Sequence, residues 1–126
     1  MDKQKYLGVD WGEKRIGLAL AEAGLSLALP FKTVDSLPDL LAVIDLEEIT
    51  DIVIGSPRKM SGEAANNPLW LDFIEKLKNS TKVNIHFIDE RLTSLAADAR
   101  GGKDKNKASR DEIAASIILQ DFLDSH

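Results

Sequence analysis

The stretch YLGVDWGEKRIGLALA, residues 6–21, decides how the rest of the chain can fold. It holds two apolar segments, residues 6–9 and 16–21, joined by a short polar turn. Such segments are typical of strands that are buried on both faces. Because side chains alternate along a strand, Asp10 shares a face with Gly8 at the point where the first strand ends. Asp10 is therefore either an ordinary turn acid or the first residue of a site that the rest of the chain must complete.

The composition limits the chemistry that the chain can carry. The 126 residues are 44% hydrophobic and 29% charged, and no apolar run approaches the length of a membrane span. The N-terminal MDKQKY leads straight into a strand, so we expect a single cytoplasmic domain, residues 1–126, that does not bind a membrane. There is no cysteine, and the two histidines lie far apart, which excludes disulfides, thiolate zinc sites and thiol nucleophiles. Any metal would be a hard cation held by carboxylates.

The net charge of −5 hides a local excess of positive charge. Residues 100–110 contain five basic side chains and one acid. Such a segment is either a strip that contacts phosphate or a solvated, lysine-rich loop. The rest of the chain is correspondingly more acidic, which argues against nucleic-acid binding over the whole surface.

Turn and capping signals divide the chain into strands and helices. The expected strands cover residues 6–9, 16–21, 25–34, 51–54 and 83–88. The expected helices begin near residues 37, 68, 93 and 110. Pro30 indicates an edge or a bulge in the third strand. The order βββαβαβαα predicts an α/β fold, in which a five-stranded mixed sheet, made of an antiparallel meander plus two parallel strands, is flanked by helices.

Acidic residues stand at the ends of several of these elements. Asp10 follows the first strand, Asp89 and Glu90 follow the fifth, and Asp111 lies in the first turn of the last helix. In an open α/β sheet, sites form at the carboxyl ends of the strands. Carboxylates that converge there without Cys or His favour Mg²⁺ or Mn²⁺, and two such ions can activate a water and stabilise the leaving oxygen of a phosphodiester. We therefore expect metal-dependent phosphodiester chemistry at this edge of the sheet.

Asp111 has two interpretations. Ser109 and Glu112 form a capping box, and an acid in the first turn also complements the helix dipole. Helical periodicity instead places Asp111 on the face of Ala115 and Ile118, which is the face expected to pack on the sheet. An inward carboxylate is costly unless it is paired or bound to a metal. The periodicity therefore favours a role in a site.

Four blocks of the sequence resemble the YqgF/RuvX family, in the same order and at similar spacing. The blocks are GVDWGEKRIGLALAEA, IVIGSPRKMSGE, FIDERLTS and DEIAASIILQDFLD, which together extend over nearly the whole chain. The resemblance implies an RNase H-like fold related to the Holliday-junction resolvase RuvC. It also implies a metal-dependent endonuclease acting in 5′-end processing of pre-16S ribosomal RNA or, alternatively, a resolvase-like DNA nuclease. By position, the family's catalytic and metal-binding acids fall on Asp10, on Glu90 with Asp89 beside it, and on Asp111.

Basic residues near these acids are the candidates for binding nucleic acid. They are Arg15, Arg58, Lys59, Arg91, Lys103, Lys105, Lys107 and Arg110. Arg15 has an alternative role, an ion pair with Glu13 or Glu22 near its own turn. Arg58 and Lys59 depart from the family's usual residues, although both are compatible with phosphate. We expect the protein to act as a monomer or a homodimer.

Two other functions fit the same residues. Asp10-Trp11-Gly12 followed by Arg15 also resembles the first phosphate motif of the actin-like ATPase and sugar-kinase superfamily. Those proteins bind ATP between two domains and use a second glycine-rich loop, whereas a single domain without such a loop is expected here. The other alternative is a non-catalytic RNase H-fold module that binds nucleic acid. Cleavage that requires both Mn²⁺ and Asp10 would distinguish the enzyme from the module.

Overall fold

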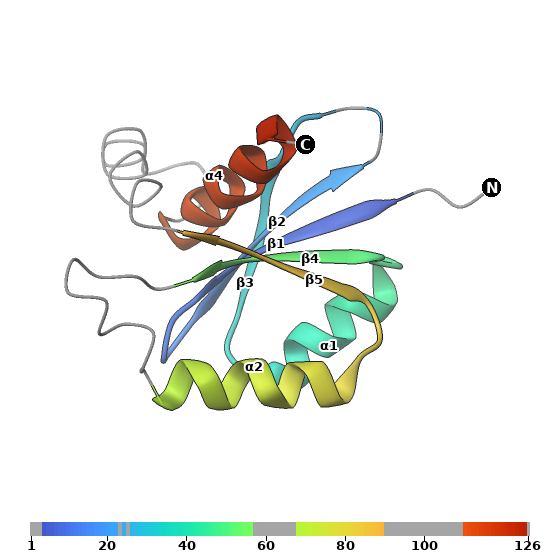
Figure 1. The fold of residues 1–126 in the computed structure, drawn as a ribbon. Coiled ribbons are helices and arrows are strands. Elements are labelled where there is room, and N and C mark those ends of the chain that lie inside the picture. The colour runs from blue at the N-terminus through green and yellow to red at the C-terminus, as the bar shows by residue number, and fades with distance from the viewer. Residues whose placement is uncertain (1–3, 23, 25, 57–67, 90–109, 126) are drawn as a thin grey trace.

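The computed structural model describes residues 4–22, 24, 26–56, 68–89 and 110–125, and Figure 1 shows their arrangement. Five strands form one sheet: β1 (Lys5–Trp11), β2 (Ile16–Glu22), β3 (Leu29–Val34), β4 (Asp51–Ser56) and β5 (Asn84–Asp89). The described helices are α1 (Leu37–Leu46), α2 (Pro68–Ser80) and α4 (Arg110–Ser125). The short helix expected near residue 93 lies outside the described residues.

The strand order in the sheet is β3-β2-β1-β4-β5. Strands β1, β2 and β3 form an antiparallel meander, whereas β1, β4 and β5 run parallel to one another. This confirms the mixed sheet expected from the sequence. Because the three parallel strands share one direction, their carboxyl ends lie at one edge of the sheet, on the left of Figure 1, where α4 also begins. Residues at the ends of β1 and β5 and at the start of α4 are therefore available to one site.

Helices cover both faces of the sheet, with α4 on one face and α1 and α2 on the other (Figure 1). The alternating strand side chains divide into two cores. Val53 and Ile118 are buried in the core under α4, and Leu7 and Leu77 are buried in the core on the opposite face. On α4, Ala115 and Ile118 are buried against the sheet, as the helical periodicity predicted, and Phe73 of α2 is buried on the opposite face. None of the helices that the structure describes is long and apolar enough to cross a membrane.

Strand β3 begins at Leu29, whereas the sequence predicted a start at residue 25. The backbone N–H of Ala28 donates a hydrogen bond of 2.9 Å to Gln120 Oε1. Because a side chain of α4 satisfies this donor, the segment before Leu29 does not need a neighbouring strand as partner. Pro30 lies at a shift of register against β2, which confirms the predicted bulge.

Two glycines allow α4 to lie directly against the sheet. A Cβ atom on Gly8 would lie 2.7 Å from the carbonyl oxygen of Ala115, closer than real Cβ atoms come. A Cβ atom on Gly17 would overlap the backbone carbonyl of Asp111. The glycines belong to the adjacent strands β1 and β2, and they face successive turns of the helix. Gly17 therefore determines where the first turn of α4 meets the sheet.

Candidate active site

Asp10 and Asp111 come together on the α4 face of the sheet, at its carboxyl edge. Asp10 is the penultimate residue of β1 and lies opposite Gly17 of β2. The backbone of Asp111 packs on the same glycine. Asp10 is half-buried, and the Asp111 side chain is 31% exposed. Strand alternation and helical period thus bring two of the predicted acids to one place, while their binding of metal or substrate stays a prediction.

The surroundings of Asp10 disfavour its ionised form. Burial raises the pKa of Asp10, and the negative charge of Asp111 raises it further. The positive charge of Arg110, the first residue of α4, opposes both effects. The resulting pKa of Asp10 is about 7. A cation bound at Asp10 would relieve this repulsion and restore the ionised carboxylate.

Arg15 forms an ion pair with Asp111. The Nε atom of Arg15 lies 3.1 Å from Asp111 Oδ2, and 68% of the Arg15 side chain is exposed. Because Arg15 directly precedes β2, this contact joins the β1–β2 turn to the first turn of α4. The sequence suggested Glu13 or Glu22 as the ion-pair partner of Arg15, but the structure shows Asp111 instead. Replacing Asp111 would therefore remove an attraction to Arg15 together with the repulsion from Asp10.

The other predicted site residues are described only in part. Asp89 ends β5 at the carboxyl edge, in register with Ser56 of β4. Arg110 begins α4 and is exposed. The remaining predicted residues lie outside the described residues: Glu90, Arg58, Lys59, Arg91, Lys103, Lys105 and Lys107. Their roles stay predictions.

The chemistry of Asp10 and Asp111 suits a hard divalent cation such as Mg²⁺ or Mn²⁺. Carboxylate oxygens are the ligands that Mg²⁺ prefers, and because Mg²⁺ keeps several waters, one or two carboxylates are enough to bind it. The pKa of Asp10 shows that the two acids lie close enough to repel each other. Within the ranges that the structure describes, no group of three Asp, Glu, His or Cys side chains could hold a metal. The two acids therefore fit such an ion as a partial ligand set.

Glu112 has a partner that the sequence did not predict. The expected capping box joins it to Ser109, which lies outside the described residues. In the structure, Glu112 Oε2 accepts a hydrogen bond of 2.9 Å from Thr33 Oγ1 on the edge strand β3. This bond ties the first turn of α4 to β3, beside Asp111, and so helps to fix the position of that turn.

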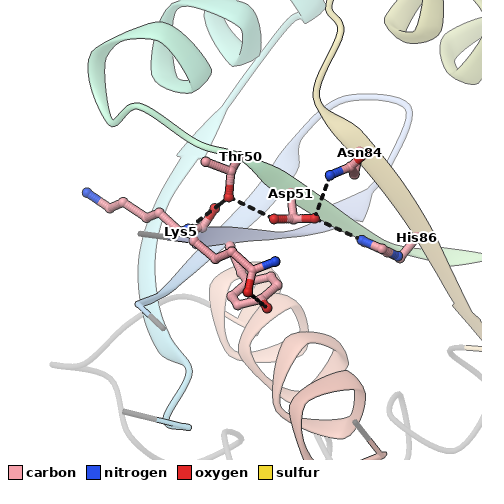
Figure 2. A network of polar contacts seen from close by, with 7 residues as sticks. Lys5, Thr50, Asp51, Asn84 and His86 are labelled. Atoms are coloured by element: carbon pink, nitrogen blue, oxygen red, sulfur yellow. Dashed lines mark hydrogen bonds and ion pairs between the residues drawn. The ribbon is translucent and has the colours of Figure 1, made fainter. Parts of the chain in front are cut away.

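A second carboxylate, Asp51, is buried at the opposite edge of the same face, where the sequence analysis saw only the start of a strand. Its residue is 3% exposed. Asp51 accepts hydrogen bonds from Thr50 Oγ1 at 2.7 Å and from Asn84 Nδ2 at 3.1 Å, as Figure 2 shows. His86 Nε2 lies 3.1 Å from Asp51 Oδ1, and the His86 ring packs on Phe122 with centroids 4.8 Å apart. The network therefore joins β4 and β5 to α4 at the edge away from the candidate site.

The Asp51 network stabilises the fold through the ionised carboxylate. Burial raises the pKa of Asp51, but the hydrogen bonds from its three neighbours and the charge of His86 lower it more, so the pKa lies below its ordinary value. For an acid whose pKa is lowered on folding, the stabilisation is present above the unfolded pKa of about 4. It is lost as the pH falls through the folded pKa.

We expect Asp51→Asn to lower the free energy of unfolding at pH 7 by about 2–4 kcal/mol, because its partly buried hydrogen bonds lose a buried, charged acceptor. The difference from wild type should narrow at pH 3, where Asp51 of the wild type is losing its charge. Urea denaturation at the two pH values measures both effects. Asp45→Asn, at an exposed position of α1, is the control. A difference below about 0.5 kcal/mol at pH 7 would contradict the assigned role.

Comparison with known sequences identifies a family model and relatives that this chain resembles. Residues 4–125 match the family model RuvX, which is described as a Holliday junction resolvase. A relative from Roseiflexus sp. (strain RS-1), named "Putative pre-16S rRNA nuclease", is 37% identical over 133 residues, which cover 96% of this chain and 94% of the relative. A relative of the same name from Rickettsia typhi (strain ATCC VR-144 / Wilmington) is 34% identical, over 97% of this chain and 86% of the relative.

Two solved structures share the fold at low sequence identity. T. thermophilus RuvC, in complex with a Holliday junction substrate, aligns with a TM-score of 0.61 and 14% identity, over 97% of this chain and 94% of RuvC. Fowlpox virus resolvase, in complex with Holliday junction DNA, aligns with a TM-score of 0.57 and 12% identity, over 97% of this chain and 98% of the resolvase. The likeness confirms the RNase H-like architecture expected from the sequence.

Proposed function

The chain belongs to the RuvX family of Holliday junction resolvases, and from this premise we propose that it is a cytoplasmic, metal-dependent endonuclease that cuts structured nucleic acid. The proposed substrate is the precursor of 16S ribosomal RNA, at its 5′ end, in keeping with the names of the relatives. The observation that carries the proposal is the pair of acids at the carboxyl edge, where Asp111 helps to raise the pKa of Asp10 to about 7. Two acids that repel each other favour the binding of a divalent cation, because the cation neutralises their charges.

Each described residue of the site has a proposed task. Asp10 and Asp111 would hold the cation, together with Glu90 and Asp89, the further ligands predicted from the sequence. A divalent ion bound there supplies a Lewis acid that polarises a phosphodiester and activates water. Arg110 and the neighbouring basic residues place positive charge beside the acids, which favours the approach of a phosphate backbone. The close packing of α4 on β2 keeps the two acids together.

A four-way DNA junction is the second candidate substrate, because the family description names it. Symmetric cutting of a junction requires two active sites related by a two-fold axis, whereas a single cut in RNA requires one. A monomer would therefore favour RNA processing, and a homodimer would favour the junction. Sedimentation equilibrium of the purified protein, with and without each substrate, distinguishes them.

The test of the proposed function is cleavage of a precursor 16S RNA fragment and of a four-way DNA junction in Mn²⁺, in Mg²⁺ and in EDTA. We expect the wild type to cut at least one of them when an ion is present, and Asp10→Asn to cut neither. Asp39→Asn, at an exposed acid on the opposite face of the sheet, is the matched control and should cut like the wild type. Equal cleavage by Asp10→Asn would refute the assigned site, and binding without cleavage would favour the non-catalytic module.

A further inference from the structure

Close packing fixes the backbone on both sides of the ion pair between Arg15 and Asp111. A Cβ atom on Gly12 would lie 2.8 Å from the carbonyl oxygen of Arg15, so glycine lets the β1–β2 turn close tightly just before β2. A Cβ atom on Gly17 would overlap the backbone carbonyl of Asp111. These contacts fix the backbones of Arg15 and Asp111 relative to each other. The exposed Arg15 side chain can still turn away from Asp111 without moving either backbone.

The described charges of the site change sign when a divalent cation binds. Asp10, Asp111 and Glu112 contribute three negative charges when ionised, and Arg15 and Arg110 contribute two positive charges, which leaves a net charge of −1. A divalent cation bound by the acids would change this net charge to +1. A positive excess in a partly buried site favours the binding of an anion, and the backbone of a nucleic acid supplies one.

Arg15 is placed to respond to such a cation. Its Nε atom contacts Asp111 Oδ2, so a cation that bound this carboxylate would compete for the same oxygen. With 68% of its side chain exposed, the guanidinium has room to turn toward solvent without crossing the core. Guanidinium binds phosphate through two parallel N–H donors, and this geometry suits it to a backbone phosphate.

We propose that Arg15 is a resident counter-ion, which holds Asp111 in the metal-free protein, is displaced from it by the divalent cation, and then binds a backbone phosphate of the substrate. The cation and the nucleic acid therefore bind cooperatively, because the first releases the residue that the second needs. This inference rests on the proposed function for the place of the cation and for the class of substrate. It does not require that the bond be cut.

The test measures metal and substrate binding separately from cleavage. Isothermal titration with MnCl₂ gives the metal affinity, which Arg15→Gln should raise by about two- to fivefold, the range of a partly exposed ion pair. The salt dependence of RNA hairpin binding is measured by fluorescence anisotropy, with the RNA checked to be intact. In Mn²⁺, the log–log slope should fall by about 0.7–0.9 in Arg15→Gln, which is the loss of one phosphate contact. In EDTA the slope should equal that of the wild type.

Two variants control for charge and geometry. Lys14→Gln removes the same formal charge from the neighbouring exposed position and should leave the Mn²⁺ affinity unchanged. Arg15→Lys keeps the charge but loses the planar donor pair. In Mn²⁺, its log–log slope should therefore fall below that of the wild type, but by less than in Arg15→Gln, and its Mn²⁺ affinity should stay near that of the wild type. Circular dichroism of each variant verifies folding.

The possible outcomes distinguish this inference from the proposed function. An unchanged Mn²⁺ affinity in Arg15→Gln, an equal fall in slope with and without Mn²⁺, or no binding of Mn²⁺ by the wild type would each overturn the role of Arg15. If the wild type cuts but either of the first two results is found, the proposed nuclease function is kept and the counter-ion role of Arg15 is rejected. If the wild type does not cut but shows the expected metal and salt dependence, the nuclease function is rejected and the counter-ion role of Arg15 is supported.

Discussion

Replacing Asp10 with asparagine should raise the free energy of unfolding of the metal-free protein at pH 8 by up to about 4 kcal/mol. The reason is the pKa of Asp10, which burial and the charge of Asp111 raise from an ordinary value near 4 to about 7. Each unit of this difference corresponds to about 1.4 kcal/mol, so ionising Asp10 costs the native state about 4 kcal/mol more than it costs the unfolded chain. Asparagine has nearly the same shape and never carries the charge.

The sign of the pH dependence follows from the same pKa. An acid whose pKa is raised on folding contributes stability that is fully present below its unfolded pKa and is lost as the pH rises through its folded pKa. The wild type should therefore lose stability relative to Asp10→Asn between about pH 4 and pH 7, and the difference should be constant above that range. Asp51 has the opposite dependence, because its pKa is lowered on folding. Asp10 therefore affects stability between about pH 4 and pH 7, whereas Asp51 affects it below about pH 4.

Urea denaturation in EDTA at pH 4, 6 and 8 measures the effect of Asp10→Asn. Asp121→Asn, at an exposed carboxylate of α4, is the control and should change the free energy of unfolding by less than about 0.5 kcal/mol at each pH. Adding Mn²⁺ should reduce the difference in the free energy of unfolding between Asp10→Asn and the wild type. A ligand that binds the native state stabilises it, and only the wild type has the complete pair of acids. An Asp10→Asn protein that is less stable than the wild type at pH 8 would refute the repulsion between the two acids.

Gly17→Ala should destabilise the protein by about 3 kcal/mol or more and abolish cleavage. The added methyl group would overlap the backbone carbonyl of Asp111, and a backbone carbonyl cannot turn aside as a flexible side chain can. The first turn of α4 must therefore lift from β2. That movement separates Asp111 from Asp10 and from Arg15, so the acidic pair and its counter-ion are lost together.

The matched control for this variant is Ala19→Gly, on the same face of β2. Removing one methyl group under α4 should cost roughly 1 kcal/mol and leave Asp111 in place, so cleavage should survive. Thermal unfolding measures the stability of both variants, and the cleavage assay is run below the melting temperature of each. A Gly17→Ala protein that is as stable and as active as the wild type would show that α4 does not depend on this close contact.

Local sequence patterns determined most of the fold. Apolar runs marked the strands, and Ser36 with the following proline marked the start of α1, where its hydroxyl accepts a hydrogen bond from the backbone of Asp39. Periods of two and of 3.6 residues predicted which faces are buried, because side-chain direction in a strand or a helix is a local property of the backbone. The same two periods placed Asp10 and Asp111 on facing surfaces.

The tertiary structure decided the polar contacts between distant parts of the chain. Sequence proximity favoured a partner for Arg15 near its own turn, whereas the fold brings Asp111 of α4 to it. Nothing in the strand pattern distinguished Asp51 from any other first residue of a strand, although Asn84 and His86 make it the centre of a buried network. An ion pair or a hydrogen bond depends on distances of a few ångströms between side chains, and a pKa depends on burial as well. Periodicity fixes only the face on which a residue lies, so these contacts exist only once the sheet and α4 have packed together.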